Sequence, residues 1–171
     1  FSMAFREITP EEIRDNMFVT INKEWMLLTA GDEKAHNTMT VSWGSTGELW
    51  GHYTATVHVR PQRYTLPFIE NNDYFSLCVL PKDKHDAMVV CGRVSGRDGD
   101  KDQKAGITPV FAEKAPYYEE ARLVLICRKL YRQEMDPSCF LDPSILTSSY
   151  PQKDFHVTFV GAIEKVLVKD E

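Results

Sequence analysis

A strict alternation of polar and apolar side chains marks residues 37–43. Short polar residues at 38, 40 and 42 are separated by Met39, Val41 and Trp43, which is the period-two pattern of a half-buried strand. The segment 44–47, Gly-Ser-Thr-Gly, predicts a turn, so residues 37–51 should form a hairpin-like unit. A strand face of short hydroxylic side chains lets a flat ligand approach the backbone. A solvent-facing strand is the alternative.

Apolar runs elsewhere predict five more strands and three short helices. The strands are expected at 25–30, 54–60, 74–80, 123–131 and 155–168. The helices are expected at 9–16, 66–71 and 82–91, from capping residues, prolines and a closing glycine at 92. Residues 133–152 are rich in Pro, Ser and Asp and predict a long excursion. The connections are too short for repeated βαβ units, so the pattern favours a mainly β fold, an antiparallel barrel with short flanking helices.

Length and charge limit the classes of partner. The 171 residues suit one domain over 3–171, with Phe1 and Ser2 interpreted as an added remnant ahead of Met3. The net charge of -5 comes from interspersed charges, so neither nucleic acid nor a membrane is an expected partner. The four cysteines form no CxxC pair, and with no signal peptide recognised before Met3 we expect reduced thiols in a cytoplasmic protein.

Two loops carry candidate anion-binding chemistry. The first, RPQRYT at 60–65, places Arg60 and Arg63 before a predicted helix, where backbone N–H groups and guanidinium groups favour phosphate. The second, SGRDGDK at 95–101, combines glycines with polar and basic donors but lacks Walker spacing. Arginines paired with surface glutamates, and an ordinary surface turn, are the respective alternatives.

The order of these motifs is more specific than any one of them. NTMTVSWG, RPQRYT, CVLP, CGRVSGRDGDK, ARLVLICRKLY and DFHVTFVGAIE follow one another along roughly residues 25–164. Together they resemble the flavin reductase-like family, especially its flavoredoxin-type branch. The resemblance implies a six-stranded antiparallel FMN-binding split barrel of Greek-key type. It also implies FMN as cofactor and a homodimer.

The same resemblance implies positions for the cofactor-binding residues. The isoalloxazine and ribityl chain should contact Asn37, Thr38, Met39, Thr40, Val41, Ser42 and Trp43. The phosphate should be held by Arg60, Arg63, Tyr64 and Thr65, with Ser95, Gly96 and Lys101 closing over it.

His156 lies on the polar side of the last predicted strand. The pattern alone favours a structural histidine. The resemblance instead suggests a catalytic position beside the flavin, where it would position the ring or a nicotinamide. We assign no metal, because no histidine has ligand companions at a suitable spacing.

The leading functional hypothesis is an FMN-dependent NAD(P)H:flavin oxidoreductase, with NADH or NADPH as co-substrate and a small-molecule or protein electron acceptor. The sequence has no GxGxxG after a strand, so a nicotinamide would have to dock on the flavin itself. Two alternatives stay open: a flavoredoxin-like electron carrier without a nicotinamide site, and a split-barrel binding module without catalysis.

Overall fold

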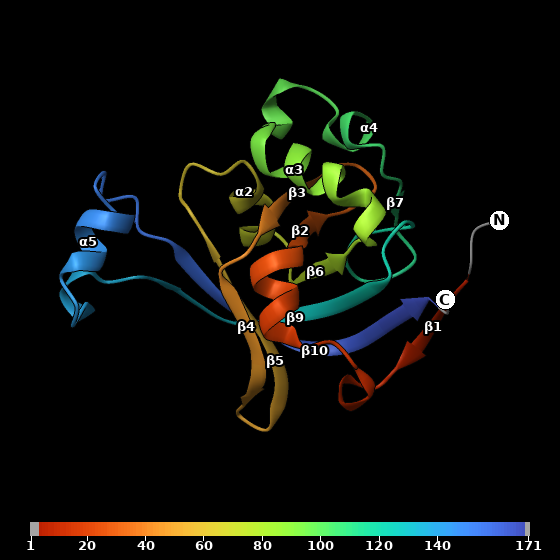
Figure 1. Ribbon diagram of the computed structural model, residues 1–171, viewed down its shortest axis with the longest axis horizontal. Helices are drawn as coiled ribbons and strands as arrows, with labels where there is room; N and C mark the ends of the chain where they lie inside the picture. The colour runs from red at the N-terminus through yellow and green to blue at the C-terminus, as the bar shows by residue number, and fades with distance from the viewer. Residues whose placement is uncertain (1–3, 170–171) are drawn as a thin grey trace.

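One large antiparallel sheet organises the computed structural model, which describes residues 4–169 (Figure 1). Its strands follow the order β3-β2-β6-β9-β10-β5-β4, and β1 pairs with the far end of β10. The eight strands are β1 (Phe5–Ile8), β2 (Met26–Gly31), β3 (His36–Val41), β4 (Gly44–Leu49), β5 (His52–Val59), β6 (Tyr74–Val79), β9 (Leu123–Glu134) and β10 (Val157–Lys169).

Short helices surround this sheet, and β7 (Pro109–Val110) pairs with β8 (Tyr117–Tyr118) in a small second sheet. The helices longer than one 3₁₀ turn are α2 (Thr65–Glu70), α3 (His85–Arg93), α4 (Lys101–Ala105), α5 (Ser144–Ser149) and the π-helical η2 (Thr20–Glu24). The single turns are η1 (Pro10–Glu12), α1 (Met17–Val19), η3 (Lys82–Lys84), η4 (Gly96–Asp98) and η5 (Pro137–Cys139).

Both faces of the central strands are buried, in two separate clusters. The inner cluster includes Leu28, Met39 and Val41, whereas the outer cluster joins Leu27 to Met88 of α3. Strands buried on both faces carry near-continuous apolar runs, which explains why β2, β6 and β9 are recognisable in the sequence.

A glycine lets the two longest strands bend around the inner cluster. The pairing of β10 with β9 shifts register beside Gly161, and a Cβ on that residue would come within 2.7 Å of the Phe75 ring. The close approach requires glycine, so the Phe75 ring can enter the core at the bend.

The mainly β, antiparallel fold class is confirmed, and all six expected strands are present as β2, β3, β5, β6, β9 and β10. The sheet adds β1 and β4 to them. The turn expected at 44–47 is wrong, because these residues form β4, paired with β5. The hairpin turns instead at Trp50 and Gly51, whose φ angles are +55° and +76°, as a two-residue primed turn requires.

The expected helices are partly corrected. Residues 9–16 hold only the turn η1, and Thr9 makes no side-chain cap hydrogen bond. The helix predicted at 66–71 is α2, one residue earlier. The helix at 82–91 is divided into η3 and α3, and α3 continues through Gly92, the predicted terminator, to Arg93.

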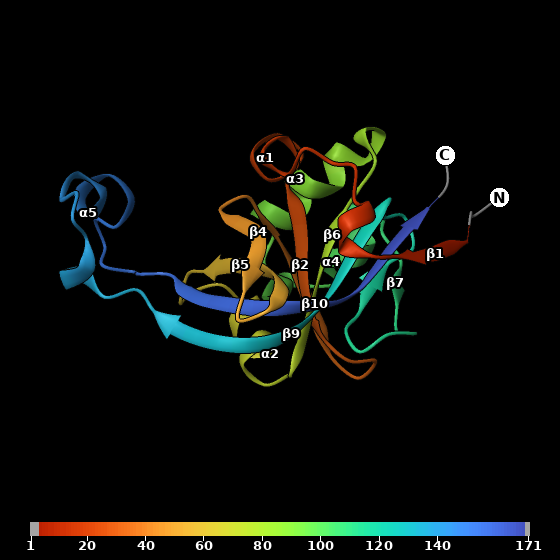
Figure 2. The same cartoon turned by 90° about the horizontal axis from the view of Figure 1, so that it is seen from below.

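The edge strands β3 and β4 are joined directly through Ser42 and Trp43. At the other end of the molecule, β9 and β10 carry the excursion that contains α5, which projects far from the sheet in both views (Figures 1 and 2). The excursion expected at 133–152 is therefore present, between these two strands.

Candidate functional site

The outer edge of β3 and the turn that follows it border an open cavity, here called the β3 pocket. Within the described residues β3 pairs with β2 alone, so backbone groups on its other edge are available to a ligand. The cavity has a volume of about 250 Å³ and is lined by Met39, Thr40, Val41, Ser42, Trp43, His58, Arg60, Arg63 and His156.

The predicted alternation along β3 is correct, but the threonine hydroxyls on its polar face already contact other protein groups. Met39 and Val41 point into the inner cluster. The Thr38 hydroxyl lies 2.8 Å from that of Thr29, and the Thr40 hydroxyl donates to the Met88 carbonyl of α3 at 2.5 Å. These two hydroxyls already have protein partners, so the backbone edge and Ser42 offer the polar groups that a ligand could use.

A second cavity, the α3 pocket, adjoins the first and shares Arg63 with it. Its volume is about 140 Å³, and it is lined by Gln62, Arg63, Tyr64, Thr65, Gly92, Arg93, Val94, Ser95, Arg97 and Lys101. The two loops proposed from sequence to hold a phosphate are therefore brought to one place.

Four cations line the α3 pocket, Arg63, Arg93, Arg97 and Lys101, and none has a carboxylate partner within residues 4–169; Arg63 and Lys101 are the two predicted to hold a phosphate. Arg63 makes one long hydrogen bond, 3.5 Å to the Gly92 carbonyl. Lys101 is buried and donates to the carbonyls of Thr38 and Cys91 at 2.6 and 3.4 Å. Burial lowers the pKa of both groups, and Arg63 further lowers that of Lys101. Buried charges are normally paired, so this arrangement favours binding of an anion.

Close contacts join β3 to the loops at 60–65 and 95–101. The Asn37 side chain donates to the Thr65 hydroxyl at 2.8 Å. A Cβ on Gly96 would lie 2.1 Å from the Asn37 amide oxygen and 2.9 Å from the Tyr64 ring, so only glycine fits there. Ser95 accepts a hydrogen bond from the Arg97 backbone N–H at 3.2 Å and so caps η4.

The other predicted arginine, Arg60, is already paired. Its guanidinium lies 3.1 Å from the Asp154 carboxylate and donates to the Ser149 carbonyl at 3.0 Å. It also stacks 5.9 Å from the Trp43 ring centre and 5.1 Å from that of Tyr150. The structure thus separates the two arginines, because Arg60 fastens the excursion to β5 whereas Arg63 is free to meet a ligand.

His156 is buried at the wall of the β3 pocket, beside Trp43 at a ring separation of 5.3 Å. Burial, together with the nearby Arg60 and His58, lowers its pKa to about 4. The imidazole is therefore neutral near pH 7. Its Nδ1 lies 2.6 Å from the Tyr150 hydroxyl.

Sequence reasoning missed two residues here: His58, which lines the β3 pocket, and Tyr150, which contacts the pocket-lining His156. The His58 Nδ1 lies 2.8 Å from the hydroxyl of Thr158, its partner across β5 and β10. The alternation of β5 could have placed His58 on the same face as Thr56. No local pattern identifies Tyr150, which belongs to the irregular excursion.

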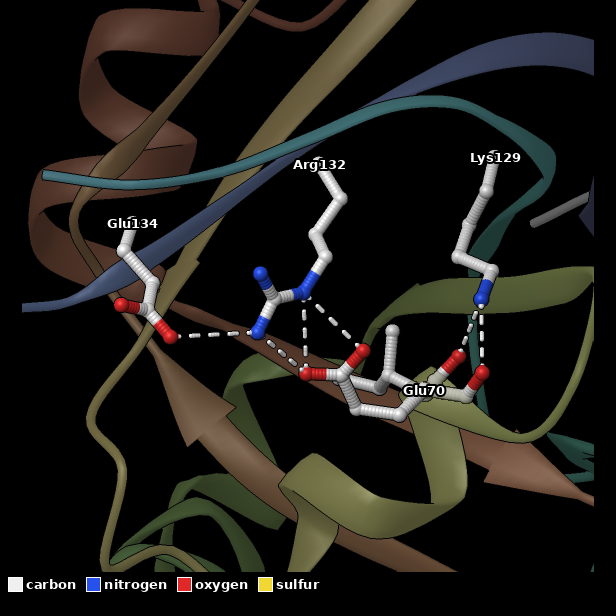
Figure 3. A network of polar contacts seen from close by, with 5 residues as sticks. Glu70, Lys129, Arg132 and Glu134 are labelled. Carbon is white, nitrogen blue, oxygen red and sulfur yellow. Dashed lines mark hydrogen bonds and ion pairs between the residues drawn. The ribbon is translucent and has the colours of Figure 1, made fainter.

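Other cations lie away from both pockets. Figure 3 shows Lys129 donating to the carbonyls of Ile69 and Glu70, at 2.6 and 3.2 Å. Arg132 forms an ion pair with the Glu70 carboxylate at 2.9 Å. These two side chains hold the end of α2 against β9 and line neither pocket.

Cysteine thiols and clusters of metal-ligating side chains are further candidates for chemistry among the described residues. The four cysteines are unpaired, and Cys78, Cys91 and Cys127 are buried. Burial raises the pKa of the Cys78 and Cys91 thiols to about 12, which leaves them unreactive. Residues 4–169 contain no group of three or more His, Cys, Asp and Glu side chains suited to a metal ion. Within the same range, no helix is long and apolar enough to span a bilayer.

Comparison with known proteins gives one family match and several similar folds. The family described as "Flavin reductase like domain" matches residues 18–171. Flavoredoxin from Methanosarcina acetivorans is 23% identical with a TM-score of 0.68, over 86% of this chain and 69% of that one. Among curated proteins, none matches this chain.

Two further solved structures have the same fold at lower identity. An FMN-binding domain of a flavin reductases-like enzyme from Shewanella baltica is 15% identical with a TM-score of 0.70, over 99% of this chain and 79% of that one. Nitrilotriacetate monooxygenase component B from Bacillus cereus is 13% identical with a TM-score of 0.67, over 98% and 83%.

Proposed function

The chain belongs to the flavin reductase-like domain family, and from that premise we propose that it binds FMN and acts as an NAD(P)H oxidoreductase that passes electrons to an acceptor. The Arg63 and Lys101 cations of the α3 pocket, which have no ion-pair partner among the described residues, carry the FMN-binding part of this proposal. An FMN phosphate bears nearly two negative charges, and charge-assisted hydrogen bonds to buried cations are among the strongest that proteins make.

The residues present fit the cofactor at both ends. Arg63 and Lys101, with Ser95 and Thr65 nearby, would hold the phosphate in the α3 pocket. The backbone edge of β3 and Ser42 would meet the polar edge of the ring in the β3 pocket. Since α2 has only six residues, side-chain charges contribute more here than a helix dipole does.

FMN supplies the redox chemistry, since it accepts a hydride and releases electrons singly or in pairs. The chain's own part is alignment and exclusion of water. Trp43 projects beside the β3 pocket with 54% of its surface exposed, so it can cover one side of a bound ring. A neutral His156 beside Trp43 in the same wall offers a hydrogen bond without adding charge.

A nicotinamide would use the same opening. The sequence lacks the glycine-rich fingerprint of a separate dinucleotide fold, and the β3 pocket is open to solvent. We therefore propose that NADH or NADPH docks directly against the flavin, which places its hydride within transfer distance.

A flavoredoxin-like electron carrier is the second candidate. It is supported by the structural similarity to a flavoredoxin and by the missing dinucleotide fingerprint. Such a carrier would hold FMN tightly in the same two pockets but would exchange electrons with a protein partner.

Anaerobic mixing of the FMN-loaded protein with a nicotinamide nucleotide distinguishes the oxidoreductase from the electron carrier. The purified protein is loaded with FMN, mixed with NADH or NADPH in a stopped-flow instrument, and followed through flavin absorbance. Rapid bleaching is the expected result. Tight FMN binding without bleaching by either nucleotide would favour the carrier, and failure to bind FMN would leave only a binding module.

We also propose that the protein is a homodimer in a reducing, cytoplasmic setting. Trp50 and Tyr53 on the β4–β5 hairpin are 57% and 44% exposed, and exposed aromatic groups of this size often mark an interface. The unpaired cysteines are consistent with reducing conditions. Light scattering of the FMN-loaded protein at micromolar concentration should give twice the mass of one chain, and a monomer mass would reject the dimer.

A further inference from the structure

Tyr150 stands at the end of the 133–152 excursion, yet its side chain is buried beside the β3 pocket. Only 5% of its surface is exposed. Its hydroxyl lies 2.6 Å from His156 Nδ1, and the two rings meet edge to face at 5.5 Å. A residue of an irregular surface segment therefore contacts the back of a pocket-lining histidine.

The chemistry of the two partners gives the hydrogen bond a direction. Burial raises the pKa of Tyr150 and lowers that of His156, so both groups are neutral near pH 7. The hydroxyl also lies 3.3 Å from the Met135 sulfur, but a thioether is a much weaker acceptor than an imidazole nitrogen. The tyrosine hydroxyl therefore donates to Nδ1, and the imidazole proton resides on Nε2.

The tyrosine is itself held on several sides. The Arg60 guanidinium lies 5.1 Å from its ring centre, and Arg60 donates to the carbonyl of the preceding residue, Ser149, at 3.0 Å. The Phe155 ring packs 4.8 Å away. Asp154 pairs with the same arginine at 3.1 Å. These contacts fix the hydroxyl relative to His156, which directly precedes β10.

We propose that Tyr150 is a positioning residue that fixes His156 in its Nε2–H tautomer and thereby presents a neutral N–H donor to a carbonyl or amide group of the bound flavin or nicotinamide. This inference rests on the proposed function. Fixing one ring nitrogen through a hydrogen bond is how proteins select the state of the other nitrogen. The excursion then has a role in the site, because it delivers the group that orients His156.

The first test uses the flavin-free protein and needs no activity. Long-range ¹H–¹⁵N NMR spectra of the imidazole rings identify the tautomer, with His156→Gln to assign the resonances. In the wild type, Nδ1 should be unprotonated and Nε2 protonated. Tyr150→Phe keeps the ring contacts with Arg60 and Phe155. In this variant both tautomers of His156 should be populated and should interconvert.

The second test measures the rate of flavin bleaching and the Kd for FMN in the same variants. Tyr150→Phe should lower the bleaching rate at least about twofold, because only part of the His156 rings then carry the Nε2 proton, while the Kd for FMN changes less than twofold. Tyr131→Phe is the matched control, since its hydroxyl contacts Gln133 and not His156. It should leave the rate and the NMR spectrum unchanged.

An Nδ1–H tautomer in the wild type would overturn the proposal, as would an unchanged tautomer in Tyr150→Phe. A lost tautomer preference with an unchanged bleaching rate would equally reject a positioning role. If the wild type binds no FMN or is not bleached, the proposed function fails separately, and the NMR result still decides whether Tyr150 fixes His156.

Discussion

Replacing Arg63 with methionine should weaken FMN binding without destabilising the ligand-free protein. The guanidinium lines both pockets, forms no ion pair among residues 4–169, and makes one hydrogen bond of 3.5 Å. Burial lowers its pKa, which means that the folded state disfavours its charge. Removing the charge therefore relieves a desolvation cost, so the free energy of unfolding of the flavin-free protein should stay constant or rise.

The loss of binding follows from the strength of one charge-assisted contact. Such a contact to a phosphate contributes ~1.5 to 3 kcal/mol, so the Kd for FMN should rise roughly 10- to 150-fold. Riboflavin has the same ring system but no phosphate. Its Kd should change little, and the preference of the protein for FMN over riboflavin should shrink by the same factor.

Fluorescence titration with both flavins, together with urea unfolding of the flavin-free protein, measures each quantity. Arg132→Met is a matched control because it removes the same charge from a side chain that is 44% exposed and paired with Glu70 (Figure 3). An exposed ion pair contributes about 0 to 1 kcal/mol to stability, and this variant should bind both flavins normally. Lys129 is a poorer control, since its ammonium holds the end of α2.

Equal loss of FMN and riboflavin affinity in Arg63→Met would show that the side chain supports the ring and not the phosphate. Unchanged FMN affinity would remove Arg63 from the site. A large loss of stability in the flavin-free variant would refute the claim that its charge is uncompensated.

Two further predictions concern the β3 pocket. Ser42→Phe should block flavin binding, and Ser42→Ala should cost at most ~1 kcal/mol of affinity. Val41→Ala, in the core, should instead lower the free energy of unfolding by roughly 1 to 3 kcal/mol and leave FMN affinity little changed. Thermal unfolding and FMN titration measure both quantities, and the opposite pattern would mean that Val41, and not Ser42, faces the flavin. Because the pKa of His156 falls from 6.5 to about 4 on folding, the unfolded chain binds the proton first. Stability should therefore drop as pH falls from 6.5 towards 4, by up to about 3 kcal/mol, and equal pH slopes for wild type and His156→Gln in urea unfolding would contradict this.

Repeating side-chain patterns were enough to find the sheet. The alternation in β3 and the apolar runs of β2, β6 and β9 each report how many faces of a strand are buried, and this is a local property of the chain. The order of the motifs likewise indicated the family that the comparison confirmed. The two loops proposed to bind an anion were noticed because one places arginines before a predicted helix and the other sets glycines beside basic donors; each pattern also fits an ordinary surface loop.

Tertiary contacts decided what each residue does. Local composition favoured a turn at 44–47, but pairing with β5 made it a strand. Arg60 and Arg63 look equivalent in sequence, and only the position of Asp154 shows that one of them is neutralised. The Thr40 hydroxyl of β3 reaches α3, and the Tyr150 hydroxyl reaches His156, because segments distant in sequence meet there. Periodicity reports burial along one element, whereas the choice of partner depends on how the elements pack against one another.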